Sequence, residues 1–213
     1  MSQRGPVYLV ASGQDGLLAP MAKRALEALG KAKPRVAVTY APVDGDAQGM
    51  RFMSRRMPGL FPGATLEAIE HDRNVVDRAD LVFVSGGDPT HGAKVLAHSG
   101  AAGWLREASA RGVPMMGVSA GAIILGDWWV DWPEDEDAPP EAASLVPCAG
   151  IVAGHVFDTH DEADGWEELH VVAQLLQKKG LRSRLIGIPT AGALVFGADG
   201  GMEVVGIPPL VLG

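Results

Sequence analysis

The chain has 213 residues, 47% of them hydrophobic, and a formal net charge of −8. A chain of this size and apolar content can bury a sizeable core, so we expect one domain spanning residues 1–213. The negative charge argues against a general nucleic-acid binder, which needs a basic face, and no apolar run reaches the roughly 20 residues that span a bilayer.

Cysteine usage indicates the cellular compartment. The sequence contains one cysteine, Cys148, so it can form no internal disulfide and no site built from several thiolates. The first residues, MSQRGPVYLVASG, lack the long apolar segment of a secretory signal. These features predict a reducing, cytoplasmic location.

The first 120 residues alternate apolar strand-like runs with helical patterns. Strands are expected at 7–11, 35–41, 64–69, 81–84 and 113–118, and helices at 17–29, 47–57 and 93–111, the last broken near 99–103. Apolar strands separated by helices are typical of a mostly parallel sheet covered by helices on both faces. We therefore expect an α/β fold.

The rest of the chain has shorter, glycine-punctuated segments. Strands are expected at 151–157, 185–188, 193–196 and 202–205, where they could finish the sheet, some of them antiparallel. Residues 163–179 carry a helical apolar stripe, and the acidic, proline-containing stretch 132–141 predicts an exposed loop.

The segment Gly117-Val118-Ser119-Ala120-Gly121 joins the predicted strand at 113–118 to a small-residue helix start. In a strand–GxSxG–helix arrangement the glycines allow a tight turn that exposes the serine at the carboxyl end of the strand. The helix start points N–H groups at developing negative charge. Ser119 is therefore a candidate nucleophile, although a glycine-rich turn that only packs tightly is the alternative.

A second glycine pair follows the predicted strand at 81–84. Carboxyl ends of parallel strands share one edge of the sheet, so Gly86-Gly87 is expected near Ser119. Acyl transfer needs two N–H donors aimed at the oxyanion, and the amides of Gly87 and Ala120 are the candidates. An ordinary turn at Gly86-Gly87 is the alternative.

Four segments together carry a family resemblance. FVSGGDPT, GVSAGAIILG, GIVAGHVFDTH and LIGIPTAGALVF, between Leu81 and Phe196, resemble the dipeptidase E and cyanophycinase family of serine peptidases. The resemblance implies a three-layer sandwich similar to class I glutamine amidotransferases. It implies Ser119 as nucleophile, His160 as general base, and Gly87 and Ala120 as oxyanion donors.

The resemblance also implies a substrate class. Family members cleave small peptides with an aspartyl residue on the acyl side, and the family needs no cofactor and no metal. A small peptide is accordingly the expected partner. The acidic flank at 161–164, where the family often has an aromatic residue and arginines, would instead favour a basic substrate side chain.

The sequence departs from the family pattern at the third member of the triad. Cyanophycinase-like members have an acid that orients the histidine at a position that matches Thr190 here. A threonine can hydrogen-bond an imidazole but cannot offset the charge of an imidazolium. Dipeptidase E-like members draw the acid from the loop after the nucleophile helix, where this chain has Asp127, Asp131 and Asp135.

Other polar residues near these motifs could have more than one role. His155 is the nearest rival to His160 as base, because geometry decides such roles. Asp158 shares a strand face with His160, so it could bind substrate or cap backbone N–H groups. Asp88 could likewise bind substrate, but capping the following helix is its favoured role.

The roles of two further groups of side chains remain open. Arginines 51, 55 and 56 could bind an anionic substrate, but a solvated helix face beside buried methionines is favoured. Tryptophans 128, 129 and 132 could wall a pocket, fill the core or form a homodimer contact.

The sequence thus predicts a serine peptidase or amidohydrolase that acts through a Ser119 acyl-enzyme. The alternative is a degenerate member that has lost its triad acid and binds a small ligand or a protein. An α/β-hydrolase esterase shares GxSxG, but the chain after Ser119 is short and lacks a well-separated later Asp and His.

Overall fold

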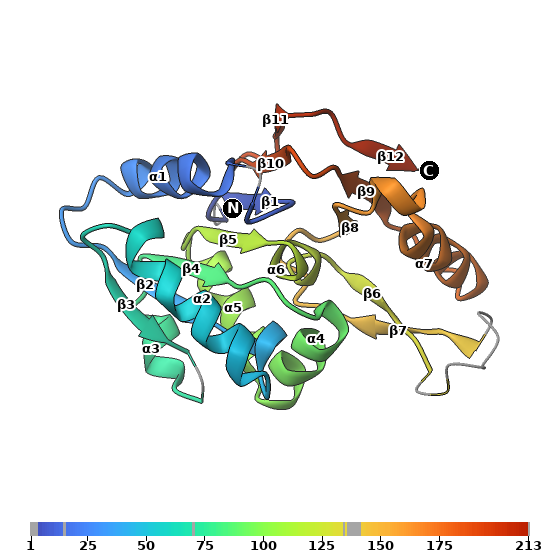
Figure 1. The fold of residues 1–213 in the computed structure, drawn as a ribbon, viewed down its shortest axis with the longest axis horizontal. Helices are drawn as coiled ribbons and strands as arrows, with labels where there is room; N and C mark the ends of the chain where they lie inside the picture. The colour runs from blue at the N-terminus through green and yellow to red at the C-terminus, as the bar shows by residue number, and fades with distance from the viewer. Residues whose placement is uncertain (1–3, 15, 70, 134, 136–141, 213) are drawn as a thin grey trace.

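A seven-stranded sheet forms the centre of the molecule. The computed structural model describes residues 4–14, 16–69, 71–133, 135 and 142–212. The strand order is β11-β10-β1-β5-β4-β2-β3 (Figure 1). The strands are β1 (Val7–Val10), β2 (Arg35–Thr39), β3 (Thr65–Ala68), β4 (Leu81–Val84), β5 (Met115–Val118), β10 (Gly192–Phe196) and β11 (Met202–Gly206).

Strand direction brings the two glycine-rich motifs together. Strands β1, β5, β4, β2 and β3 are mutually parallel, whereas β10 and β11 are antiparallel additions beside β1. In the β4–β5 pair, Val84 aligns with Gly117, so both chains leave the sheet at the same edge. Residues 86–87 and Ser119 follow immediately.

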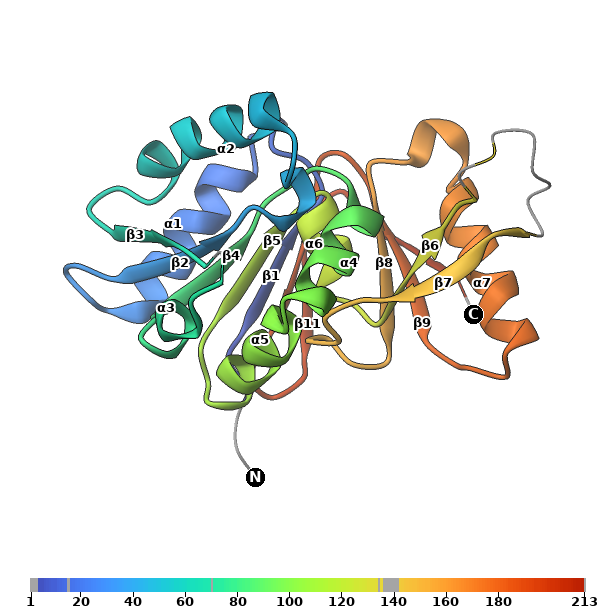
Figure 2. The same cartoon turned by 90° about the horizontal axis from the view of Figure 1, so that it is seen from below.

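Helices cover both faces of this sheet (Figure 2). Helices α1 (Leu18–Leu29) and α2 (Ala47–Leu60) pack on one face, where Met21 and Met57 meet strand residues such as Phe83. Helices α3 (Arg73–Asp77), α4 (Pro89–His98) and α5 (Ala101–Ala110) cover the other face. The predicted α/β fold with helices on both faces is confirmed.

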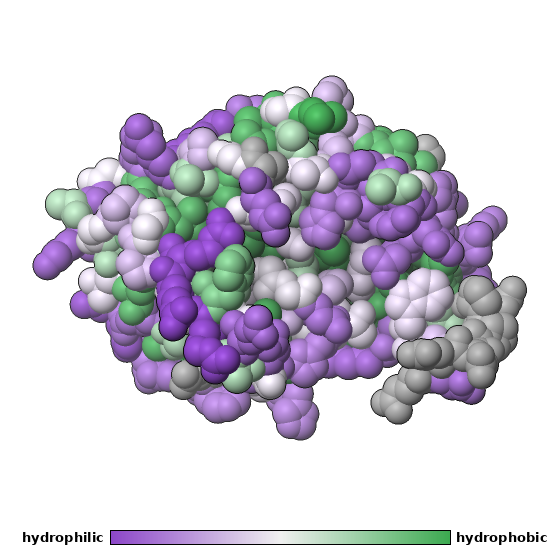
Figure 3. All heavy atoms as spheres, in the orientation of Figure 1, coloured by the Kyte–Doolittle hydropathy of each residue, from purple (hydrophilic) through white to green (hydrophobic). Residues whose placement is uncertain are grey.

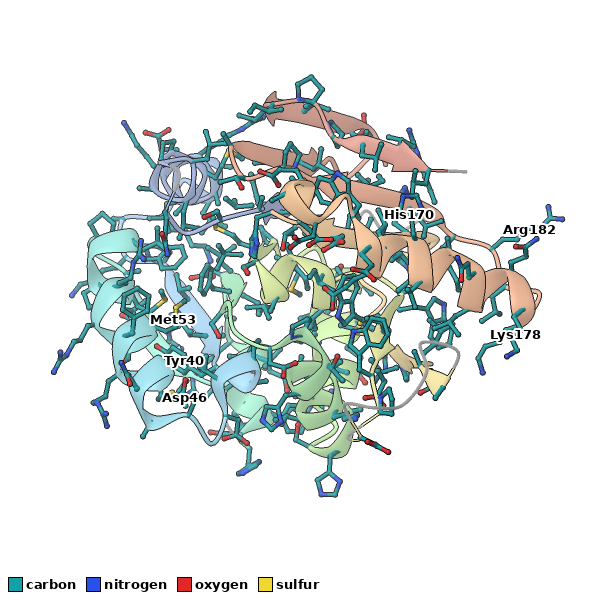
Figure 4. The ribbon with its side chains drawn as sticks, turned by 45° about the vertical axis from the view of Figure 1, so that its right-hand side comes forward. Tyr40, Asp46, Met53, His170, Lys178 and Arg182 are labelled. Atoms are coloured by element: carbon teal, nitrogen blue, oxygen red, sulfur yellow. The ribbon has the colours of Figure 1, made fainter. Side chains whose placement is uncertain are left out.

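The C-terminal half adds a second layer of strands beside the main sheet. Strands β8 (His155–Thr159) and β9 (Arg184–Ile188) are parallel, and β12 (Leu210–Leu212) pairs antiparallel with β9. Strands β6 (Trp128–Asp131) and β7 (Ser144–Pro147) form a hairpin. Helix α7 (Glu167–Lys178), on which Figure 4 labels His170 and Lys178, packs against both groups of strands.

The structure corrects several expected boundaries. The segments expected at 151–157 and 185–188 do not finish the main sheet but form the separate three-stranded one, and β8 begins only at His155 because 151–154 form a turn. Helix α7 begins at Glu167, after a 3-10 turn at Glu162–Asp164 and a left-handed Trp166. Part of the stretch expected as a loop at 132–141 lies outside the described residues.

Among the described residues, one α-helix and three strands were not expected from the sequence: α3, β6, β7 and β12. The expected helix at 93–111 is two helices, α4 and α5, that meet at Ser99 and Gly100, where the break was predicted. Across the described residues, each helix is too short or too polar to cross a membrane.

Candidate active site

Ser119 lies in a sharp turn between β5 and helix α6 (Ala120–Ile124). Its φ of 53° and ψ of −125° are unusual for a residue with a side chain, and its backbone N–H donates to the Val10 carbonyl at 2.9 Å. The strained conformation turns the hydroxyl out of the strand direction. Ser119 therefore lies at the carboxyl edge of the sheet, as the GxSxG pattern predicts.

Close backbone packing explains why glycine follows this serine two residues later. A Cβ on Gly121 would lie 2.2 Å from the Val84 carbonyl oxygen, far inside van der Waals contact. The start of α6 is thereby pressed against the end of β4. The residues after β4 consequently lie beside the serine: a Cβ on Gly86 would be 3.9 Å from Ser119 Oγ.

His160 reaches the serine from the second sheet. Its Nε2 lies 2.9 Å from Ser119 Oγ. His160 follows β8 directly, has a left-handed backbone with φ of 50°, and donates its N–H to the Ile188 carbonyl at 2.9 Å. The rival His155 lies at the opposite end of β8, where its Nδ1 is 3.0 Å from the Ala153 carbonyl oxygen.

The two expected amide donors, Ala120 and Gly87, belong to the two segments that meet at Ser119. The N–H of Ala120 is the first of helix α6, a position with no acceptor inside its own helix. Gly87 has φ of +142°, and a Cβ there would lie 2.2 Å from the Pro42 carbonyl oxygen. Only glycine fits this bend, which carries the chain from β4 past Ser119 into α4.

A cleft of about 720 Å³ opens in front of these groups. Its floor is formed by Ser119, His160 and the 86–87 glycines, and its walls come from the loop after β1 and from α2, in particular Phe52, Met53, Arg55 and Arg56. The space-filling view shows strongly hydrophilic side chains gathered over α2 (Figure 3), and Figure 4 labels Met53 on this helix. The cleft can hold a small ligand.

The arginines of α2 are exposed beside the buried Met57, as the favoured sequence interpretation expects, and two of them also line the cleft. Arg56 donates from Nη2 to the Gly13 carbonyl at 2.7 Å, and its guanidinium lies 5.2 Å from the centre of the Phe52 ring. Arg55 and Arg56 line the cleft, while Arg51 does not. The role of these arginines could not be read from helical periodicity alone, because the cleft depends on a loop near residue 13.

Two of the three aspartates suggested as the acid partner of His160, Asp127 and Asp131, have partners elsewhere. Asp127 accepts hydrogen bonds from Gly154 N and Ser183 Oγ, at the end of β8 away from His160. Asp131 forms an ion pair with Lys94, and Asp135 is exposed. Thr190 donates its backbone N–H to the Glu162 carboxylate at 3.0 Å, so a carboxylate does occupy the neighbourhood of this threonine.

Asp88 and Asp158, the two expected substrate-binding residues, lie outside the set that lines the cleft. Asp88 caps α4, with its Oδ1 accepting the His91 N–H at 2.9 Å. Asp158 is only 1% exposed, and its Oδ1 accepts the Thr159 N–H at 2.7 Å. Helix capping by Asp88 is confirmed, and substrate binding by either residue stays a prediction.

The tryptophans near the nucleophile helix lie in different environments. Trp129 is buried in the core, and Trp132 is 39% exposed and donates its indole N–H to Glu168 at 3.1 Å. Neither they nor Trp128 line the cleft in front of Ser119.

The buried carboxyl of Asp158 makes the stability of the protein depend on pH. Burial, together with the nearby Asp161 and Glu168, raises the pKa of Asp158 from 3.8 to about 8. The folded state keeps this proton where the unfolded chain has lost it, so the free energy of unfolding falls as pH rises from about 4 to about 8. Asp158→Asn should weaken this decline, as urea titrations across the pH range would show. An unchanged slope would contradict the assignment.

Comparison with known proteins identifies one family. Residues 59–204 match the model described as peptidase family S51. A peptidase from an acI-B1 Actinobacterium superposes with a TM-score of 0.75 at 21% identity, over 99% of this chain and 95% of the other. A putative peptidase E protein from Listeria monocytogenes EGD-e gives 0.66 at 14%, over 96% and 99%.

A third similarity is local. A segment of 62 residues is 37% identical to the pyridoxal 5'-phosphate synthase subunit PdxT of Methanosarcina barkeri. It covers 29% of this chain and 30% of the length of that protein.

Proposed function

The chain belongs to peptidase family S51 and is a serine-type peptidase, and from this premise we propose that Ser119 is its nucleophile and His160 its general base. The observation that carries the proposal is the 2.9 Å separation of Ser119 Oγ and His160 Nε2 on the floor of the cleft. This distance is within the range in which a base takes a proton from a hydroxyl. The turn at Ser119 acts as a nucleophile elbow.

The reaction follows the usual sequence of acyl transfer. His160 Nε2 takes the hydroxyl proton as Ser119 Oγ bonds to the carbonyl carbon of the peptide, and the oxyanion accepts hydrogen bonds from the N–H groups of Gly87 and Ala120. His160 then gives the proton to the leaving amine as the C–N bond breaks. Water attacks the acyl-enzyme with His160 again as base, releasing the carboxylic acid and restoring Ser119.

For the substrate we propose a small peptide with an acidic residue, such as aspartate, on the acyl side. Arg55 and Arg56 in the cleft wall support this class, because a guanidinium pairs well with a carboxylate. The acids that follow His160 do not line the cleft, which weakens the case for a basic side chain. A volume of about 720 Å³ suits a short peptide better than a folded protein.

Removing the charge of a cleft arginine, and comparing substrates that differ in charge, tests this substrate class. Arg55→Gln should raise KM for an Asp-X dipeptide by about tenfold, the size of a hydrogen bond to a charged group, and should leave KM for an Ala-X dipeptide nearly unchanged. Arg51→Gln, on the same helix but outside the cleft, is the matched control. Steady-state kinetics on Asp-X, β-aspartyl, Lys-X and Ala-X peptides measures both effects. Preference for Lys-X peptides would contradict the acidic substrate class.

The alternative function is binding without catalysis, because Thr190 stands where relatives place an acid. Titration of the fraction of protein modified by a fluorophosphonate probe distinguishes the two. Stoichiometric modification supports the peptidase mechanism, and no modification at high probe concentration supports the binding module.

A further inference from the structure

We propose that Glu162 is the positioning residue that orients the His160 imidazole and offsets its charge, and that Thr190 holds the Glu162 carboxylate in place. The inference rests on the proposed roles of Ser119 and His160. A base histidine works best when a third group fixes its tautomer and stabilises the imidazolium. Here the carboxylate comes from the residue two positions after the histidine.

The backbone ties the three residues together. His160 N–H bonds to the Ile188 carbonyl at the end of β9, and Thr190 follows Ile188 by two residues. Glu162 opens the 3-10 turn that follows His160, and its Oε1 accepts the Thr190 N–H at 3.0 Å. The Thr190 side chain also hydrogen-bonds this carboxylate. Glu162 is thereby held against the strand end that also anchors His160.

The Glu162 carboxylate remains ionised and can accept a further hydrogen bond. Partial burial raises the pKa of Glu162, but the hydrogen bonds from Thr190 outweigh it, so that the pKa lies below its ordinary value, and the charge acts on His160. A carboxylate has about four acceptor sites, and the Thr190 bonds leave room for an imidazole N–H. Among the described residues, the His160 ring has one hydrogen-bond partner, Ser119, so its Nδ1 is available to Glu162.

Asp161 is the competing candidate, since its charge also acts on His160. The Glu167 N–H at the start of α7 interacts with the Asp161 carboxyl, whose Oδ2 is buried without a hydrogen-bond partner among the described residues. Burial and the neighbouring Asp164 raise the pKa of Asp161, which weakens it as a counter-ion. Asp158 is buried two residues before His160, and Arg55 and Arg56 line the same cleft as His160.

The test is the rate of fluorophosphonate labelling of Ser119 as a function of pH, which needs no knowledge of the substrate. Glu162→Gln keeps the shape and the Thr190 N–H bond but removes the charge. It should slow labelling at neutral pH by about 10²-fold, the size of a general-base contribution. It should also move the acid limb of the profile to lower pH, because the imidazolium loses a counter-ion. Thr190→Val, which removes the hydroxyl but keeps the backbone N–H that Glu162 accepts, should show a smaller change of the same sign.

Asp164→Asn is the matched control, because it removes an equal charge from the same exposed turn and should slow labelling by less than about fivefold. Circular dichroism of each variant checks that the fold is kept. A wild-type rate and pH profile in Glu162→Gln would overturn the proposal, as would a larger loss in Asp161→Asn or an equal loss in Asp164→Asn. Absence of labelling in the wild-type protein would instead overturn the proposed function, so the two failures are distinguishable.

Discussion

Ser119→Ala is expected to abolish peptide hydrolysis and covalent labelling by a fluorophosphonate probe. Within the described residues, the Ser119 hydroxyl is the hydrogen-bond partner of His160 Nε2, at 2.9 Å, so its removal leaves this base without the hydroxyl that it would activate. Loss of the nucleophile of a serine peptidase lowers kcat by about 10⁶-fold. Mass spectrometry of the intact and digested protein after labelling measures the effect directly.

The matched control for this experiment is Ser54→Ala. Ser54 lies on α2, and its hydroxyl donates to the Arg51 carbonyl at 3.2 Å, so its loss should change neither labelling nor hydrolysis. The substitution at Ser119 should leave the fold intact, because the hydroxyl stabilises no buried partner. Persistent labelling of the Ser119→Ala protein at another residue would remove Ser119 from the mechanism.

Gly87→Ala is expected to have the second-largest effect, because it disturbs both the backbone and the proposed oxyanion donor. Its φ of +142° is accessible essentially to glycine alone, and the new methyl group would collide with the Pro42 carbonyl at 2.2 Å. The chain must move, and the N–H of residue 87 moves with it. Removing one oxyanion donor costs about 10²- to 10³-fold in kcat, and the strain lowers the free energy of unfolding by about 1–3 kcal/mol.

Gly86→Ala is the neighbouring comparison. Its added methyl group would meet Ser119 Cβ at 3.4 Å, a tight but tolerable contact, and its φ is not in the left-handed region. This variant should stay folded with a smaller loss of kcat. Thermal unfolding and kcat measured on both variants check the pair, and equal stability and activity of Gly87→Ala and wild type would refute the role given to residue 87.

The fold of the first half was predictable because its signals are local. The strands at 7–11, 81–84 and 113–118 are apolar runs that end at glycine or serine, and the break near 99–103 coincides with the left-handed Gly100. The hairpin of β6 and β7 was not predictable in the same way. Its strands are joined across 12 intervening positions, from Asp131 to Ser144 in register, so pairing depends on packing against α7 rather than on a turn signal.

The candidate site was predictable only as far as its motifs reach. Ser119, Gly87 and Ala120 stand at strand ends whose common edge follows from a parallel sheet. His160 depended on the family resemblance, because periodicity gives no distance between β8 and β5. The Glu162–Thr190 contact joins a 3-10 turn to the residues after β9, and no spacing in the sequence predicts such a contact.

Among the described residues, three that carry side chains adopt positive φ: Ser119, His160 and Trp166. Two of these are the proposed reacting groups, each holding a conformation that costs about 1–3 kcal/mol. Part of the stability of the fold is therefore offset by the strain that keeps these two groups in contact on the floor of the cleft. Substitutions selected for heat resistance alone would tend to remove the backbone strain at these two positions first. In this protein, thermal stability and catalytic turnover therefore make opposite demands on the same residues.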